Sequence, residues 1–174
     1  MKIVVGICTG RCGSQSLAEI MSKQNKTLAY HEAYWRSRGT TFRDRYPTLS
    51  IRDNSFPSIY VKYIENLISK YEKYVDVFFD IGPYTKNSIM TLKEKYDDIK
   101  FVILKRDFVN FKKSFLKKEV KGGILGDKKI ISFESAKEYY NFIYDENIMN
   151  LDNSFLIETE DLRDKEKVLK LLSF

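Results

Sequence analysis

A segment near the amino terminus has the residue types of an anion-binding loop. Residues 9–17 read TGRCGSQSL and follow a short apolar run that is typical of a buried strand. Glycine allows a tight turn that brings backbone N–H groups close to an anion, and the start of a helix adds unpaired N–H donors. The segment therefore predicts a cradle for phosphate or sulfate, with a βα turn that binds no ligand as the alternative. The expected ligands are Gly10, Arg11, Cys12, Gly13, Ser14, Gln15 and Ser16.

The spacing of this loop excludes three common phosphate-binding motifs. A Walker A loop requires the ending Gly-Lys-Ser/Thr, which no register here supplies. A phosphatase loop of the form C-x5-R is excluded because neither Cys8 nor Cys12 is followed by an arginine at that spacing. The G-x-G-x-x-G fingerprint of dinucleotide sites is also missing from the sequence.

A second candidate anion site follows a later apolar run. Residues 102–107 read VILKRD, and Ser114 lies on the helix predicted to follow Arg106. An arginine fork matches a phosphate group, and a serine about two turns into the helix can share that phosphate. Taken singly, a surface ion pair explains Arg106 and an exposed helix position explains Ser114. Together, and behind a phosphate loop, they indicate a second phosphate site.

The two sites resemble those of sulfotransferases that use 3′-phosphoadenosine-5′-phosphosulfate (PAPS). The first segment is similar to the family's 5′-phosphosulfate loop at Arg11, Gly13, Ser14 and Leu17. Cys12 stands where the family usually has serine.

The resemblance extends over residues 1 to about 172. Arg106 and Ser114 fall at the positions with which the family binds the 3′-phosphate of the nucleotide. Residues 157–162, IETEDL, are similar to a Tyr-Glu-Asp-Leu element, with Thr159 where a tyrosine often touches the adenine. A helix cap explains the acids Glu160 and Asp161 equally well. The basic, glycine-rich segment that covers the 3′-phosphate in many members has no counterpart after the last predicted strand.

The resemblance implies transfer of a sulfuryl group from PAPS, as co-substrate, to a hydroxyl or amine acceptor, with no metal. Arg11 is then expected beside the bridging oxygen, where negative charge develops. Some members take the acceptor's proton with a glutamate just after the second strand, and Glu32 occupies that place. His31 is expected to orient Glu32 or to be the base itself, with a hydrogen-bonded structural histidine as the alternative. Asp80 is a third candidate for the base.

An alternation of strands and helices must position these residues. Short apolar runs are each followed by helical periodicity, which predicts an α/β fold with a mostly parallel five-stranded sheet flanked by helices. The chain is expected to form one domain, residues 1–174, and the resemblance implies a P-loop NTPase-like sulfotransferase core. Ligands of such sheets bind beyond the carboxyl ends of the strands, where every candidate residue falls.

The predicted strands span residues 2–8, 27–30, 75–81, 99–105 and 154–159. Helices are predicted over 14–23, from 58, from Thr85 to about 96, over 108–118 after an Asp107 cap, over 136–150 and at the carboxyl terminus. Segments 33–57 and 119–133 lack periodicity and are expected to form mobile loops. The first loop carries arginines that suit an acidic acceptor: Arg36, Arg38, Arg43, Arg45 and Arg52.

The basic composition suits an anionic ligand or partner but does not choose between a nucleotide, a nucleic acid and a membrane surface. The formal charge is +6 and the sequence pI is about 9.1, which alone does not support nucleic-acid binding. No apolar stretch approaches the ~18 residues of a membrane span, and no signal peptide is evident. The two cysteines lack zinc-binding spacing. We therefore expect a cytoplasmic protein whose partners are a nucleotide and a small-molecule or glycan acceptor, with no nucleic acid and no membrane; an oligomer is compatible with the sequence.

Besides nucleic-acid binding, which has only the net charge behind it, two other functions remain open at the level of sequence. One is a non-catalytic module that binds the nucleotides PAP or PAPS, or another anion, and has lost turnover. The other is a P-loop kinase, which the missing Gly-Lys-Ser/Thr and the lack of an evident Mg²⁺ carboxylate near the loop disfavour.

Overall fold

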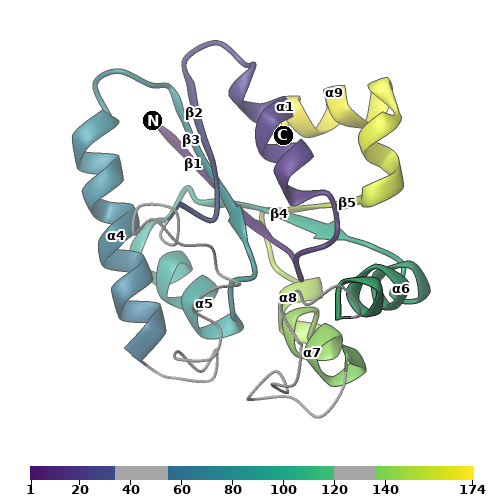
Figure 1. Ribbon diagram of the computed structural model, residues 1–174. Coiled ribbons are helices and arrows are strands. Elements are labelled where there is room, and N and C mark those ends of the chain that lie inside the picture. Colours follow the sequence, from purple (N-terminus) through teal and green to yellow (C-terminus); the bar gives the residue numbers. More distant parts are fainter. Residues whose placement is uncertain (34–54, 120–135) are drawn as a thin grey trace.

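The computed structural model describes residues 1–33, 55–119 and 136–174 (Figure 1). At its centre is a five-stranded sheet in the order β2-β3-β1-β4-β5, in which every neighbouring pair is parallel. The strand β1 therefore lies in the middle, between β3 and β4. The strands are β1 (Lys2–Ile7), β2 (Thr27–His31), β3 (Val77–Gly82), β4 (Lys100–Lys105) and β5 (Ser154–Glu158).

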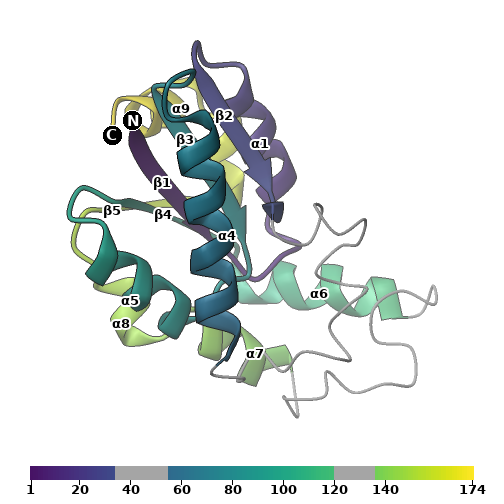
Figure 2. The ribbon, with the colours of Figure 1, turned by 90° about the vertical axis from the view of Figure 1, so that its left-hand side faces the viewer.

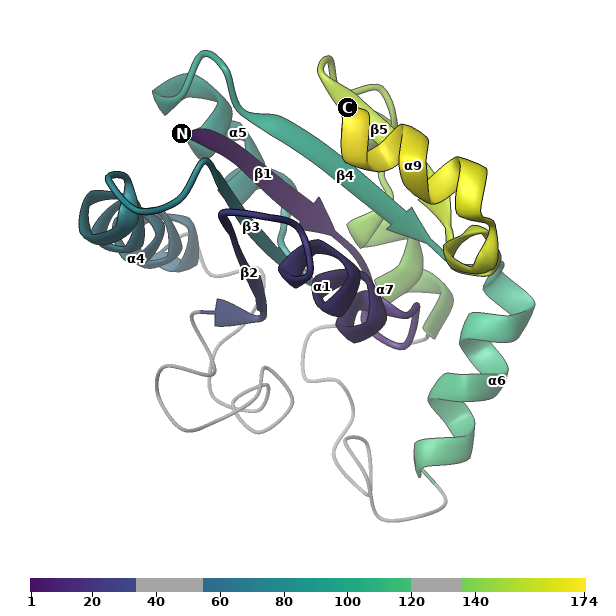
Figure 3. The ribbon, with the colours of Figure 1, turned by 90° about the horizontal axis from the view of Figure 1, so that it is seen from above.

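Helices cover both faces of the sheet (Figure 3). One face carries α1 (Ser14–Ser22) and α9 (Lys165–Ser173), which follows a 3-10 turn over Thr159–Arg163. The other face carries α4 (Ser55–Tyr71), α5 (Lys86–Lys95), α7 (Ala136–Ile143) and α8 (Glu146–Met149). The helix α6 (Phe108–Glu119) follows β4 and contacts α7.

The strands are apolar on both sides because both faces of the sheet are covered. Alternate residues of one strand point to opposite faces. Val5 and Phe78 belong to the core beneath α4 and α5, whereas Val4 and Phe79 belong to the core beneath α1 and α9. Burial on both faces fixes the register, since a one-residue shift would exchange the two sets.

The predicted fold class is confirmed, and the sheet is parallel throughout. The predicted strands differ from the observed ones by at most two residues at either end. The predicted helix over 136–150 is wrong. It is divided into α7 and α8, because the Asp145 carboxylate accepts a hydrogen bond from the Ile148 N–H (2.9 Å) and caps a new helix.

The limits of the two predicted loops also need correction. Ser55–Pro57 already belong to α4, and Glu119 is the last residue of α6. A proline is tolerated in the first turn of a helix, where its missing N–H has no partner to lose. The remainder of both segments, with the five arginines, lies outside the described residues, apart from the buried Ala33. In the described part of the chain, no helix has the length and apolar character to span a membrane.

Candidate functional site

The loop after β1, residues 8–13 (the β1 loop), turns through left-handed backbone conformations. Gly10, Arg11 and Gly13 have φ angles of 70°, 57° and 85°. Gly13 is the N-cap of α1, and its carbonyl accepts the Leu17 N–H at 3.0 Å. A Cβ at Gly13 would lie 3.1 Å from Leu162, so this position needs glycine both for its backbone and for space.

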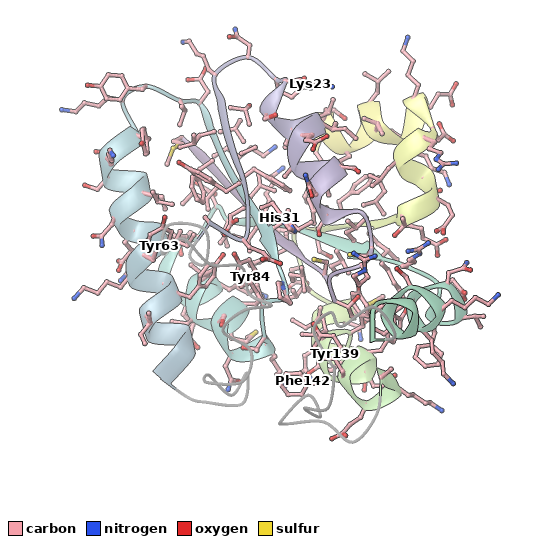
Figure 4. All side chains as sticks on the ribbon, in the orientation of Figure 1. Lys23, His31, Tyr63, Tyr84, Tyr139 and Phe142 are labelled. Carbon is pink, nitrogen blue, oxygen red and sulfur yellow. The ribbon has the colours of Figure 1, made fainter. Side chains whose placement is uncertain are left out.

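Two tyrosines of α7 and the turn that follows it hold the entry to the β1 loop. The Tyr139 hydroxyl donates to the Thr9 carbonyl (2.9 Å), and the Thr9 N–H donates to the Tyr144 oxygen (3.3 Å). The Tyr144 hydroxyl in turn donates to the Leu104 carbonyl of β4 (2.6 Å). Figure 4 shows Tyr139 at the end of the sheet where the β1 loop lies. The loop is thus tied to α7 and β4 through neutral hydroxyl groups.

The turn after β5 holds the exit of the β1 loop. The Thr159 hydroxyl lies 2.6 Å from the Cys12 carbonyl and 3.2 Å from the Lys105 carbonyl, so it ties the loop to the end of β4. The acid Asp161 accepts the Glu158 N–H at 3.2 Å as part of a capping box. The capping explanation therefore accounts for Asp161, and Thr159 has a structural role that the sequence did not indicate.

Two thiols lie at the β1 loop. Cys8 and Cys12 are free and completely buried. Burial raises the pKa of the Cys8 thiol. Burial would also raise the pKa of Cys12, but hydrogen bonds from Cys8 and from the N–H groups of Ser14, Cys12 and Gly10 lower it. The cradle thus favours negative charge at its centre, and the Cys12 sulfur is what it surrounds in this structure.

Arg106 lies at the end of β4 with its guanidinium against the β1 loop. Its Nη1 donates to the Arg11 carbonyl (2.9 Å), and its Nε is buried with no hydrogen-bond partner among the described residues. The Tyr140 hydroxyl donates to the Arg106 carbonyl at 2.7 Å. The guanidinium is therefore fixed in place and keeps an unsatisfied donor, which an anionic oxygen would satisfy.

Ser114 is half-buried on α6, about two turns from the start of that helix. The predicted cap of α6 is confirmed, since Asp107 Oδ1 accepts the Asn110 N–H at 3.0 Å.

The Gln15 and Ser16 side chains are exposed on the first turn of α1, and Gln15 Nε2 donates to Glu19 at 3.3 Å. Gln15 and Ser16 can still offer an anion their backbone N–H groups, which belong to the first turn of α1.

The short turn after β2, residues 31–33 (the β2 turn), brings two candidate bases beside the start of α1. His31 Nε2 lies 3.0 Å from the Ser14 hydroxyl and 3.7 Å from Glu32 Oε1. Both contacts use the same imidazole nitrogen, so the three side chains do not form a linear proton relay of the Ser-His-acid type. Glu32 has a φ of 57°, and its N–H donates to the Ile81 carbonyl of β3 at 2.9 Å.

Asp80, the third candidate base, is fully buried in β3. Its Oδ1 accepts the Ala33 N–H (3.1 Å), and its Oδ2 accepts the hydroxyls of Tyr84 and Tyr60, the latter at 3.3 Å. Burial raises the pKa of Asp80 to about 7, although these three hydrogen bonds oppose the rise and Glu32 adds to it. Since Asp80 is enclosed, it cannot contact an acceptor directly, and its network links α4 to the β2 turn.

The fold thus brings most of the predicted residues to one end of the sheet. The β1 loop, the β2 turn and Arg106 all follow the carboxyl ends of strands, and Figure 4 shows His31 and Tyr84 in this region. Sequence reasoning missed Tyr60, Tyr84 and Tyr139, because a single sequence does not show which distant groups a tyrosine hydroxyl will meet. Among the described residues, no three His, Cys, Asp or Glu side chains form a group that could hold a metal ion.

The fold is an α/β domain with a five-stranded parallel sheet. A shikimate kinase from Bacteroides thetaiotaomicron has a similar structure, with a TM-score of 0.50 over 99% of this chain and 97% of the kinase, at 14% sequence identity. No protein-family model matches the chain, and no curated protein matches its sequence. At this identity the likeness establishes the architecture, an α/β domain with a five-stranded parallel sheet, and the site must argue for its own chemistry.

Proposed function

We propose that this chain binds PAPS across the β1 loop and Arg106 and transfers its sulfuryl group to a hydroxyl or amine acceptor. The observation that carries the proposal is Arg106, whose guanidinium is held against the β1 loop and keeps a buried Nε without a partner among the described residues. A nucleotide with phosphate groups at both its 5′ and 3′ positions needs two anion sites joined in this way.

Different parts of the site serve the two ends of such a nucleotide. The N–H groups at the start of α1, next to Gly13 and Ser14, suit the 5′-phosphosulfate, because a helix amino terminus attracts anions. The Arg106 guanidinium suits the 3′-phosphate, with Ser114 farther along α6 as a second donor.

Transfer requires a base, an in-line acceptor and stabilisation of the leaving group. The acceptor oxygen or nitrogen attacks the sulfur and gives its proton to Glu32. The bond from sulfur to the bridging oxygen breaks, and PAP leaves with the electron pair. Arg11, exposed at the tip of the β1 loop, stabilises the charge on that oxygen, an effect of about 3 kcal/mol for one well-placed donor. His31, in contact with both Ser14 and Glu32, orients the base or replaces it.

Phosphoryl transfer is the second candidate, because a shikimate kinase shares the fold. Such enzymes need a nucleoside triphosphate with Mg²⁺ and a cation on the transferred phosphate. The β1 loop has no lysine at the Walker A position. Asp80, the acid near the end of β3, is fully buried and enclosed by hydrogen-bond donors. These two observations favour sulfuryl over phosphoryl transfer.

The test is calorimetric titration of the protein with PAP, AMP, and ATP with and without Mg²⁺. We expect micromolar binding of PAP that is clearly tighter than binding of AMP. Arg106→Ala should weaken PAP binding by about 10- to 100-fold, since it removes charge-assisted hydrogen bonds, and should leave AMP binding unchanged. Arg163→Ala removes one charge elsewhere on the described surface and is the matched control.

The titrations separate the candidate functions. Equal affinities for PAP and AMP would overturn the 3′-phosphate site, and tight Mg²⁺-dependent ATP binding would favour the kinase. If PAP binds but PAPS is not turned over with any of a panel of phenol, amine and sugar acceptors, the chain is a non-catalytic nucleotide-binding module.

A further inference from the structure

Asp80 is the only acidic or basic side chain that is buried among the described residues. Enclosing a carboxyl group costs several kcal/mol unless its oxygens find partners, and an apolar residue of similar size would avoid that cost. Its position in β3 is therefore informative. Strand β3 lies between β1 and β2, the two strands whose ends carry the β1 loop and the β2 turn.

Both oxygens of the Asp80 carboxyl group have partners, and these come from three different segments. Tyr60 belongs to α4, Tyr84 follows β3, and the Ala33 N–H closes the β2 turn. The two tyrosine rings stack on each other with centroids 4.0 Å apart and an interplanar angle of 22°. This stacking fixes both hydroxyls, so the carboxyl group has one orientation.

Through Ala33 the network reaches the proposed base. Ala33 follows Glu32, whose left-handed backbone (φ 57°) is unfavourable for a residue with a side chain. Two hydrogen bonds to β3 hold this conformation: Glu32 N–H to the Ile81 carbonyl and Ala33 N–H to Asp80. The first is an ordinary backbone contact, whereas the second depends on a side chain that can change its charge.

We propose that Asp80 is a positioning residue, which fixes the β2 turn and thereby the direction and charge of the His31–Glu32 pair. Its catalytic consequence rests on the proposed function, whereas its effect on the β2 turn does not. Four groups with protons to lose face Asp80: Tyr30 of β2, Tyr60 of α4, Tyr84 and Glu32. Burial raises the pKa of all three tyrosines, so they stay neutral near pH 7 and leave Glu32 as the charged neighbour.

The sign of the coupling follows from this arrangement. Burial raises the pKa of Asp80 to about 7, so the group is protonated in mild acid and carries a negative charge above neutral pH. That charge strengthens the hydrogen bond from Ala33 and raises the proton affinity of Glu32 and His31. The Cys8 thiol also faces Glu32, but burial raises its pKa and keeps it protonated there.

Nuclear magnetic resonance tests the coupling without any substrate. The Ala33 amide proton should shift downfield with a midpoint near pH 7, and the Asp80→Asn variant should abolish that transition. The Glu32 amide, bonded to a carbonyl in the same turn, is the internal control and should follow much more weakly. His31 is the only histidine, so its ring proton gives a second signal, whose pH dependence should differ between the wild type and Asp80→Asn.

Kinetics test the consequence for catalysis. In Asp80→Asn, kcat for sulfuryl transfer should fall about 10- to 100-fold and KM for PAPS should not change, because a misplaced base slows the chemical step alone. The pH dependence of kcat near 7 should also be lost. Tyr84→Phe retains the carboxyl group and offers a second test if Asp80→Asn does not fold. Because it removes a hydrogen-bond donor to the carboxylate, it should move the pH midpoint of the Ala33 amide shift upward. Tyr139→Phe, which removes a buried hydroxyl at the β1 loop, should leave that midpoint in place.

Failure of this proposal and failure of the proposed function give different results. An Ala33 amide that does not titrate in the wild type, or titrates equally in Asp80→Asn, overturns the positioning role whatever the enzyme does. If the Ala33 amide titrates clearly but the protein neither binds PAP nor uses PAPS, the coupling between Asp80 and the β2 turn stands. The proposed sulfuryl transfer is then overturned.

Discussion

The β1 loop and the β2 turn lie at the same end of the sheet, but different chemistry holds them. The β1 loop is tied down mainly by neutral hydroxyls, from Tyr139, Tyr144 and Thr159, and Arg106, whose charge does not change across the physiological pH range, adds one contact to the Arg11 carbonyl. The β2 turn is tied to β3 by a backbone contact and by the carboxyl group of Asp80. Figure 2 shows both segments near one another, at the ends of β1 and β2 beside α1.

This contrast indicates a division of labour within the site. Burial raises the pKa of Tyr144, and threonine does not titrate, so these two anchors of the β1 loop keep their form across the physiological pH range. The anchor of the β2 turn changes charge near pH 7. The hydroxyl anchors should therefore hold the β1 loop in the same way across this range, whereas the geometry and charge of the proposed base should respond to pH.

The largest expected effect that tests this contrast is on stability. The pKa of Asp80 is about 4 in the unfolded chain and about 7 in the folded one, so the folded state binds more protons between these values. Stability contributed by this group is fully present below about pH 4 and is lost as the pH rises through about 7. Between about pH 5 and about pH 8 the loss amounts to about 2 to 3 kcal/mol.

Urea unfolding of the wild type and of Asp80→Asn at both pH values measures this loss. Other carboxyl groups contribute pH dependence of their own, so the difference between the two proteins is the relevant quantity. Asp152→Asn, at a side chain that is 85% exposed, is the matched control and should show no such difference. Parallel pH profiles for the wild type and Asp80→Asn would mean that the buried carboxyl group does not titrate in this range.

The second effect concerns the β1 loop and is independent of pH. Gly13→Ala places a methyl group 3.1 Å from Leu162 and 3.4 Å from Thr159, on a backbone with φ 85°. We expect a loss of about 1 to 3 kcal/mol in the free energy of unfolding, together with weaker PAP binding. Gly10→Ala is the control, because its φ of 70° is similarly unfavourable but no atom lies within 4 Å of the added Cβ. Equal losses at the two positions would show that backbone strain alone matters.

The sequence predicts well what depends on local pattern. The alternation of apolar runs and helical periodicity predicted the parallel sheet, and Thr85 and Asp107 cap the helices that follow them. The β1 loop was recognisable because glycines between a strand and a helix have few other uses. The division between α7 and α8 was also signalled, since Asp145 has the residue type of a cap within a periodic segment.

The contacts that hold the site were not predictable in the same way. Thr159 lies 147 positions from Cys12, and Tyr139 lies 130 positions from Thr9. Such pairs meet because β4 pairs with β1, β5 pairs with β4, and α7 packs against the same sheet, an arrangement that a single sequence does not reveal. Asp80 was predicted only as a third candidate for the base, and its complete burial and its two tyrosine partners became evident only from the structure.

The smallest effect tests whether the anchors of the β1 loop are neutral. Thr159→Val removes the hydroxyl that contacts the Cys12 and Lys105 carbonyls and preserves the shape of the side chain. The loss in the free energy of unfolding should be about 1 kcal/mol, as for one buried hydrogen bond, and should be the same in mild acid and mild base. Thr159→Ser keeps the hydroxyl and should recover most of the loss. A cost that changed with pH in the same way as that of Asp80→Asn would contradict the contrast, because the two segments would then respond to pH as one unit.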